Sequence, residues 1–237
     1  MTQDILAAVR DELQQQADEK TRIDSKRYFK EDFICYGVKT VTVTKIAQKY
    51  WPEIKHLPKK EIFTLCEELF RADYMEEAFI ACEWVYRLRS QYEKADFAVM
   101  ENWIAKYINN WAKCDTLCNH SVGTLVEMYP QYAENLKQWA RSENRWLRRA
   151  AAVTLIIPAR EGRFLQNIFQ IADILLADQD DLVQKGYGWM LKAASQAHQT
   201  EVFEYVMRNK KAMPRTALRY AIEKMPEDLK KRAMEKT

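Results

Sequence analysis

Apolar residues recur at the three- and four-residue spacing of an α-helix along almost the whole chain, and this periodicity limits the fold more than any other feature. Clear examples are Ile5, Val9 and Leu13; Ile62, Leu65, Cys66 and Leu69; Phe79, Cys82, Val85 and Tyr86; and Leu165, Ile168, Phe169, Ala172 and Leu175. Side chains at this spacing lie along one face of a helix, so the pattern predicts a succession of amphipathic helices. Five Gly and six Pro are few for 237 residues. The turns must then be short, which favours an all-α fold over a strand-rich sandwich.

Interruptions of the pattern divide the chain into segments that are mostly about 12–18 residues long. They fall near residues 20–22, 37–40, 52–58, 71–73, 91–94, 128–131, 142–144, 158–162, 178–181, 197–200, 209–214 and 225–227. Consecutive pairs of segments make units of about 35–40 residues, the length of two-helix solenoid repeats. We therefore expect a curved solenoid of antiparallel helix pairs, an α–α superhelix whose concave side holds an extended partner. Because no linker rich in Pro, Gly or Ser interrupts the chain, we expect one domain over residues 1–237.

Charge is distributed unevenly, although the net charge is only +3. Residues 137–237 hold 19 Lys and Arg against 12 Asp and Glu, whereas the preceding residues hold 18 against 22. This asymmetry favours a polyanionic partner, although a run such as 227–236 also fits a solvated helix face.

Cysteine usage argues against disulfides and against a metal or other cofactor. The five cysteines are Cys35, Cys66, Cys82, Cys114 and Cys118, an odd number at scattered positions. This pattern indicates reduced thiols in a cytoplasmic protein. Cys114, Cys118 and His120 lie close in sequence, but no CxxC pair completes a zinc set, so we expect no metal. No apolar run reaches the ~20 residues of a membrane helix, and the N-terminal sequence is unlike a signal peptide, so we expect no membrane partner.

Trp111 and Asp115 are four residues apart in a segment predicted to be helical, so both side chains should lie on one face. An acid beside an indole is unusual in a core but suits a surface that meets a cation or a sugar. The alternative for Asp115 is a solvated helix residue or a helix cap. Trp111 and Trp189 lie among polar residues and glycines, and we expect both to be exposed. The tryptophans expected in the core are Trp84, Trp103, Trp139 and Trp146.

Cations accompany Trp189 and a second predicted helix. Lys185 precedes Trp189 by four residues and Lys192 follows it by three, and Gly186 and Gly188 leave room for a close backbone or ligand. The second group is Arg145, Arg148 and Arg149. Arg145 and Arg149 are four residues apart, so their positive charges repel each other on one helix face. Either an anion bound in front of them relieves this repulsion, or both side chains extend along the surface with their charged ends in solvent. In the N-terminal part, Tyr28 and Lys30 could add a base or phosphate contact, or Tyr28 could belong to the core.

Four spaced motifs resemble the AlkD family of bacterial DNA alkylation repair glycosylases. They are RYFK..F...G at 27–37, W...D at 111 and 115, N.WL.RAA at 144–151 and QK..GW.L at 184–191. The resemblance implies a curved stack of HEAT-like repeats that grips duplex DNA as a monomer. It also implies excision of N3- and N7-alkylated purines without base flipping.

By position, the resemblance implies that Asp115 is the catalytic acidic residue and that Trp111 and Trp189 pack on the sugar of the lesion. It also implies that Arg149 lies in the DNA groove and that Tyr28 lies near the DNA. One departure is that Asp181 and Leu182 stand where the family pattern has an aromatic pair, and this changes the expected grip on DNA rather than the chemistry.

The predicted chemistry also follows from the residues. A cationic purine leaves without a general acid, so the remaining task is to stabilise an oxocarbenium-like sugar, which a carboxylate and indole faces can do. We therefore expect an enzyme that hydrolyses N-glycosidic bonds. No Walker loop, dinucleotide fingerprint, Ser-His-Asp set or HExxH motif supports another enzyme class. There are two alternatives. The first is a non-catalytic helical-repeat module that binds DNA or a protein. The second is a protein–protein scaffold with apolar patches on its concave face.

Overall fold

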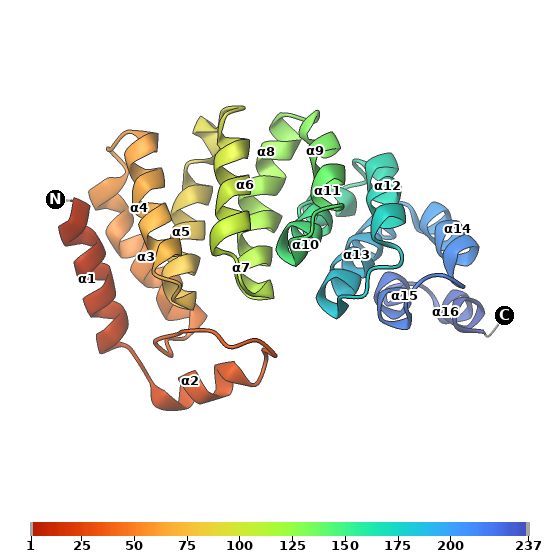
Figure 1. Ribbon diagram of the computed structural model, residues 1–237, viewed down its shortest axis with the longest axis horizontal. Helices are drawn as coiled ribbons and strands as arrows, with labels where there is room; N and C mark the ends of the chain where they lie inside the picture. The colour runs from red at the N-terminus through yellow and green to blue at the C-terminus, as the bar shows by residue number, and fades with distance from the viewer. Residues whose placement is uncertain (1, 236–237) are drawn as a thin grey trace. The chain divides into compact units, whose positions relative to one another are not determined.

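The computed structural model describes residues 2–235, and over these residues it is helical, with turns and loops between the helices (Figure 1). No β-strand occurs in this range, although an isolated parallel bridge pairs Ile34 with Tyr74. The all-α prediction is therefore confirmed. The chain divides into two compact units, Met1–Leu117 and Cys118–Thr237. The single domain expected over residues 1–237 stays a prediction.

The first unit is a set of packed helices with one helix lying apart. Its elements are α1 (Thr2–Gln15), α2 (Glu19–Lys26), α3 (Thr40–Ile54), α4 (Lys59–Arg71), α5 (Met75–Arg87), the 3-10 helix η1 (Arg89–Gln91), α6 (Asp96–Tyr107) and α7 (Trp111–Thr116). Helix α5 is central, because α3, α4 and α7 all pack against it. Figure 1 shows α2 running across one end of the other helices, and α2 has no buried residue.

A π-helix, η2 (Leu117–Val122), continues α7 and contains the division between the two units. The second unit then comprises α8 (Gly123–Met128), α9 (Tyr132–Trp139), α10 (Arg145–Val153), α11 (Ile156–Arg160), α12 (Leu165–Leu175), α13 (Asp181–Ala194), α14 (Gln199–Asn209), α15 (Arg215–Ile222) and α16 (Glu227–Met234). Helix α13 is central here and packs against α10, α11, α12 and α15. A Cβ on Gly188 would lie 2.7 Å from Tyr220 Cβ and 2.8 Å from the Ala217 carbonyl oxygen. Gly188 therefore admits a neighbouring helix, the close backbone approach that its place in the sequence left open.

The helical periodicity predicted most elements, but it misplaced one break and missed others, such as residues 154–155 between α10 and α11. The break predicted near residues 20–22 is wrong, because Asp18 caps α2 through a 2.7 Å bond from Thr21 N and the helix runs through this region. A break at Ile108–Asn110 was not predicted. The expected core tryptophans are confirmed at 0–8% exposure, and they are Trp84, Trp103, Trp139 and Trp146.

Two absences hold for the described part of the chain. None of its helices has the length and apolarity needed to cross a bilayer. No group of three or more His, Cys, Asp or Glu side chains in residues 2–235 could hold a metal ion. All five cysteines are free thiols, and burial raises the pKa of Cys66 and Cys82.

Candidate catalytic and DNA-binding sites

Helix α7 is preceded by Asn110, whose backbone is extended. The Asn110 side chain is fully buried, and its Oδ1 accepts a hydrogen bond of 3.0 Å from Lys113 N. This is an N-cap, which satisfies one of the unpaired amides at a helix start. Trp111 is the first residue of α7, and Asp115 lies one turn later on the same face.

Lys113 holds the first turn of α7 in place through hydrogen bonds to residues outside the helix. Its ammonium lies 2.6 Å from Asp73 Oδ1 and 2.8 Å from the Asp73 carbonyl oxygen, and it also donates to Asn109 Oδ1 at 3.1 Å. The Lys113 side chain is 1% exposed, so these partners offset the cost of burying its charge. Asp73 adopts a left-handed conformation with φ 66° in the turn between α4 and α5. The lysine therefore ties α7 to that turn.

Asp115 is 9% exposed, and Asn110 is the residue that caps α7. Asp115 is consequently neither a solvated helix residue nor the cap of this helix. The predicted exposure of Trp111 and Trp189 is met only in part, because each is half-buried. Trp111 is covered in part by Phe29, whose ring stacks on the indole at a centroid distance of 5.0 Å and an interplanar angle of 16°.

Phe29 belongs to a small apolar cluster in the first unit. Phe33, Met75 and Ala112 are its buried members, and Phe29, Cys35, Phe79 and Trp111 pack against them. A cavity of about 290 Å³ adjoins the cluster. Its lining includes Tyr28, Phe29, Phe79, Glu76 and Trp111. Trp111 is thus one wall of an aromatic cavity, a feature that sequence reasoning missed.

The segment that carries Phe29 is anchored by Glu76 at the start of α5. One carboxylate oxygen of Glu76 accepts from Gly37 N at 2.8 Å and from Val38 N at 3.0 Å, and the other accepts from Tyr36 N at 3.0 Å. Gly37 has φ 90°, and a Cβ there would lie 2.5 Å from the Asp18 carbonyl oxygen. A glycine is therefore required at the end of the 27–37 motif. Tyr28, at the other end of the motif, is 77% exposed and not part of the buried core.

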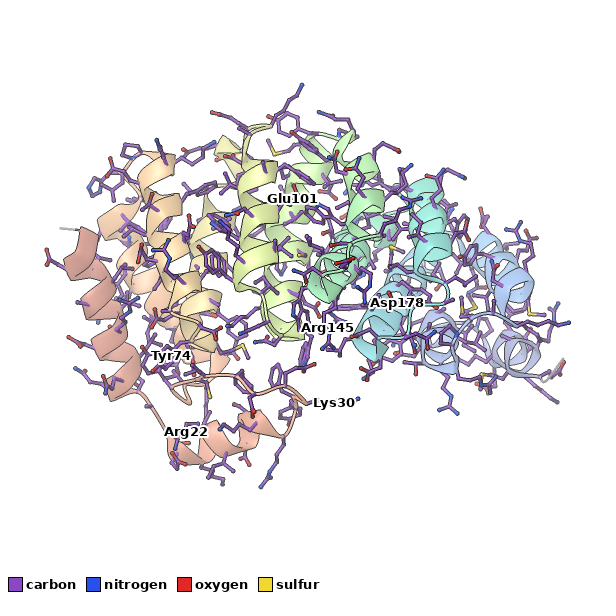
Figure 2. The ribbon with its side chains drawn as sticks, in the orientation of Figure 1. Arg22, Lys30, Tyr74, Glu101, Arg145 and Asp178 are labelled. Atoms are coloured by element: carbon purple, nitrogen blue, oxygen red, sulfur yellow. The ribbon has the colours of Figure 1, made fainter. Side chains whose placement is uncertain are left out.

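In the second unit, the predicted arginines are held by acids that precede α13. Arg145 Nε lies 2.8 Å from Asp180 Oδ2, and Arg148 Nε lies 2.7 Å from Asp178 Oδ2. Figure 2 shows Arg145 on α10 and Asp178 in the segment that leads into α13. Asp180 also caps α13, accepting from Leu182 N at 2.9 Å. Arg145 thus has an anionic partner within its own unit.

Arg149 and the two lysines also have partners within the second unit. Arg149 is 5% exposed and donates to the Leu182 carbonyl oxygen, and its side chain lies 3.5 Å from a Cβ built on Gly186. Lys185 pairs with Asp181 at 3.2 Å, one turn earlier on α13.

Lys192 pairs with Glu223 at 2.9 Å and lies over the Tyr220 ring. The departure at 181 therefore gives a carboxylate to Lys185, whereas the bond from Arg149 goes to the backbone carbonyl of residue 182 and does not depend on its side chain.

These arrangements give the two units different chemical capacities. The first unit offers a nearly buried carboxylate and a partly accessible indole on one helical turn. The second offers a buried arginine, Arg149, and partly exposed cations in ion pairs, for which an external anion can compete because partly solvated pairs are weak.

Comparison with known proteins agrees with the resemblance found in the motifs. The family model described as DNA alkylation repair enzyme matches residues 9–225. A solved structure described as a predicted DNA alkylation repair enzyme from Enterococcus faecalis has a similar fold, with a TM-score of 0.80. The match covers 90% of this chain and 98% of that chain at 15% identity. No curated protein gives a match to the sequence.

Proposed function

Because the chain belongs to the DNA alkylation repair enzyme family, we propose that it is a DNA glycosylase. It excises cationic N3- and N7-alkylated purines from duplex DNA and leaves the base in the stack while the glycosidic bond breaks. The observation that carries the proposal is the placement of Asp115, at 9% exposure, one turn from the half-buried indole of Trp111. A protein that only binds DNA gains nothing from an acid at such a surface, because the carboxylate repels phosphate.

In the proposed reaction, the bond between C1′ and N9 of the alkylated purine breaks, and its electron pair leaves with the base, which becomes neutral. The carboxylate of Asp115 stabilises the positive charge that develops on the sugar and orients a water molecule. The water oxygen forms the new bond to C1′, and its proton passes to the carboxylate or to solvent. Electrostatic stabilisation is strong here because the carboxylate is largely shielded from water.

Trp111 adds a cation–π interaction with the same developing charge, worth about 0.5–2 kcal/mol. We assign Trp189 the role of the second catalytic tryptophan. The proposed DNA-binding residues are Tyr28, Arg145, Arg148, Arg149, Lys185 and Lys192. Phosphate can compete with the acids that now pair with Arg145, Lys185 and Lys192, because each of these pairs is partly solvated and contributes little free energy.

The direct test is to incubate the full chain with a duplex that contains a single N7-methylguanine and to measure release of the free base. Release by the wild-type protein, together with its loss in Asp115→Asn, supports the proposal. Tight duplex binding without any release contradicts it and supports the non-catalytic binding module.

A series of lesions tests the mechanism. We expect a bulky cationic adduct to be excised only mildly more slowly than N7-methylguanine, and uracil or hypoxanthine to be left intact. The reason is that the proposed mechanism uses no general acid to protonate a neutral leaving group. The positive charge of the damaged base therefore selects the substrate. Efficient release of a neutral base, or exclusion of the bulky adduct, would contradict the mechanism and favour a flipping pocket.

A further inference from the structure

Phe29 is the aromatic side chain against which the indole of Trp111 rests. The two rings are nearly parallel, at an interplanar angle of 16° and a centroid distance of 5.0 Å. Tyr28, the adjacent residue, is 77% exposed. Neighbouring aromatics of one motif thus have different surroundings, one at the surface and one against Trp111.

Phe29 is itself held in place by the segment that follows it. Its ring lies 4.4 Å from the ring of Phe33, which is 8% exposed. The segment is joined to the start of α5 by a 2.9 Å hydrogen bond from Met75 N to the Ile34 carbonyl oxygen. The three backbone N–H groups that donate to Glu76 follow soon after Ile34 in the chain. Phe29 therefore forms a fixed support rather than a mobile loop side chain.

The cavity of about 290 Å³ shows why a support is needed. Phe29, Phe79 and Trp111 all line it, so the indole borders open space. An indole has rotational freedom about two side-chain bonds, and packing on one side is what restricts it. Without the Phe29 ring, the cavity would enlarge and the Trp111 indole could turn into it.

We infer that Phe29 is a positioning residue: it sets the plane of the Trp111 indole and so aligns this side chain for the reaction at the sugar. The inference rests on the proposed function, because the alignment matters only if Trp111 acts on the sugar. Phe29 acts through Trp111 and needs no contact with DNA. Its loss should therefore change the rate of bond cleavage more than the affinity for the duplex.

The experiment compares three variants of the full chain on a duplex with one N7-methylguanine. Phe29→Leu removes the ring, Phe29→Tyr keeps it, and Phe63→Leu removes a ring that packs on the core indole of Trp103 in the same unit, at a centroid distance of 5.1 Å. We expect Phe29→Leu to lower the single-turnover rate at saturating enzyme about 10-fold, because small misplacements of reacting groups are costly. Affinity for an undamaged duplex should stay within about twofold, and Phe29→Tyr should restore the rate. Phe29→Met repeats the test if Phe29→Leu folds poorly.

A wild-type rate in Phe29→Leu overturns the inference, and so does an equal rate loss in a Phe63→Leu protein of the same thermal stability. A second readout does not depend on activity. In protein labelled with 5-fluorotryptophan, Trp111→Phe identifies the Trp111 resonance, and we expect Phe29→Leu to shift or broaden that resonance more than those of the core tryptophans. An unchanged Trp111 resonance overturns the inference. If wild-type protein releases no base while the resonance moves, the proposed function fails and the positioning of Trp111 by Phe29 stands.

Discussion

The first residues of α7 in the first unit are held by an aromatic ring against Trp111 and by the bonds of the buried Lys113. In the second unit, arginines of α10 instead pair with carboxylates just before α13. The Lys113 side chain is 1% exposed and that of its partner Asp73 is 41% exposed, whereas the corresponding values are 34% for Arg145 and 19% for Asp180. Because the Lys113 ammonium is buried, it needs its hydrogen-bond partners in place, whereas partly solvated pairs exchange with other ions at small cost. The first arrangement suits preorganised chemistry, and the second suits binding to a polyanion. Substitutions in the two regions should accordingly separate reaction rate from DNA affinity.

The largest expected effect is that of Asp115→Asn. We expect the single-turnover rate of base release to fall by about 100-fold or more, because the variant loses the charge that stabilises the cationic sugar. Duplex affinity should be equal or higher, since a charge that repels phosphate is gone. Fluorescence anisotropy and a base-release assay measure the two quantities. Arg145→Ala is the matched control from the second unit, where affinity should fall and the rate at saturating enzyme should persist. Base release at the wild-type rate by Asp115→Asn would end the assignment of a catalytic role.

Asp73→Asn tests the carboxylate that neutralises the buried ammonium of Lys113 in the first unit. Asn tolerates the left-handed conformation of this position, so the variant removes mainly the charge that faces Lys113. We expect the free energy of unfolding to fall by about 1–3 kcal/mol, because the buried ammonium loses its carboxylate. Denaturant unfolding measures this, with Asp180→Asn as the corresponding change at the partly exposed pair. Equal losses in the two variants would remove the distinction between the regions.

How far the sequence predicted these regions depends on how local the interactions are. Helical periodicity correctly placed Trp111 and Asp115 on one face and identified the core tryptophans, because a helix repeats over a few residues. The partners of the site residues lie much further apart in sequence. Lys113 and Asp73 are separated by 40 residues, and Arg148 and Asp178 by 30. Only the packing of α5 against α7 and of α10 against α13 brings such groups together.

The aromatic support of Trp111 was missed for a related reason. The 27–37 segment follows α2 without being helical, so periodicity carries no information about its side chains. The one local signal was Gly37, whose positive φ is required where the segment turns toward Glu76. Phe29 and Phe33 have helical spacing of four, yet they meet as neighbouring rings of an irregular segment.

Asp180→Asn should also sharpen the comparison through DNA binding. Asn is as good an N-cap as Asp, so α13 keeps its first turn while Arg145 loses an anionic partner. We expect duplex affinity to rise about threefold and the salt dependence to steepen by at most about one counterion. Asp180→Ala, which also loses the cap, should be less stable without binding better than Asp180→Asn. Titrations at several salt concentrations decide this, and an unchanged affinity of Asp180→Asn for the duplex would mean that Arg145 makes no phosphate contact.

The smallest effect should come from Lys185→Ala. Lys185 is 33% exposed and pairs with Asp181 within α13, and such pairs contribute about 0.2–0.5 kcal/mol. Stability should therefore barely change, while duplex affinity should fall about twofold to threefold if the lysine contacts phosphate. Lys192 is the informative comparison, because its side chain is 16% exposed between Glu223 and the Tyr220 ring. Lys192→Ala should lose more stability than Lys185→Ala through lost packing of the side chain. Thermal unfolding and salt titration of both variants separate the two roles, and a Lys185→Ala variant with wild-type affinity at low salt would assign Lys185 to the solvated surface.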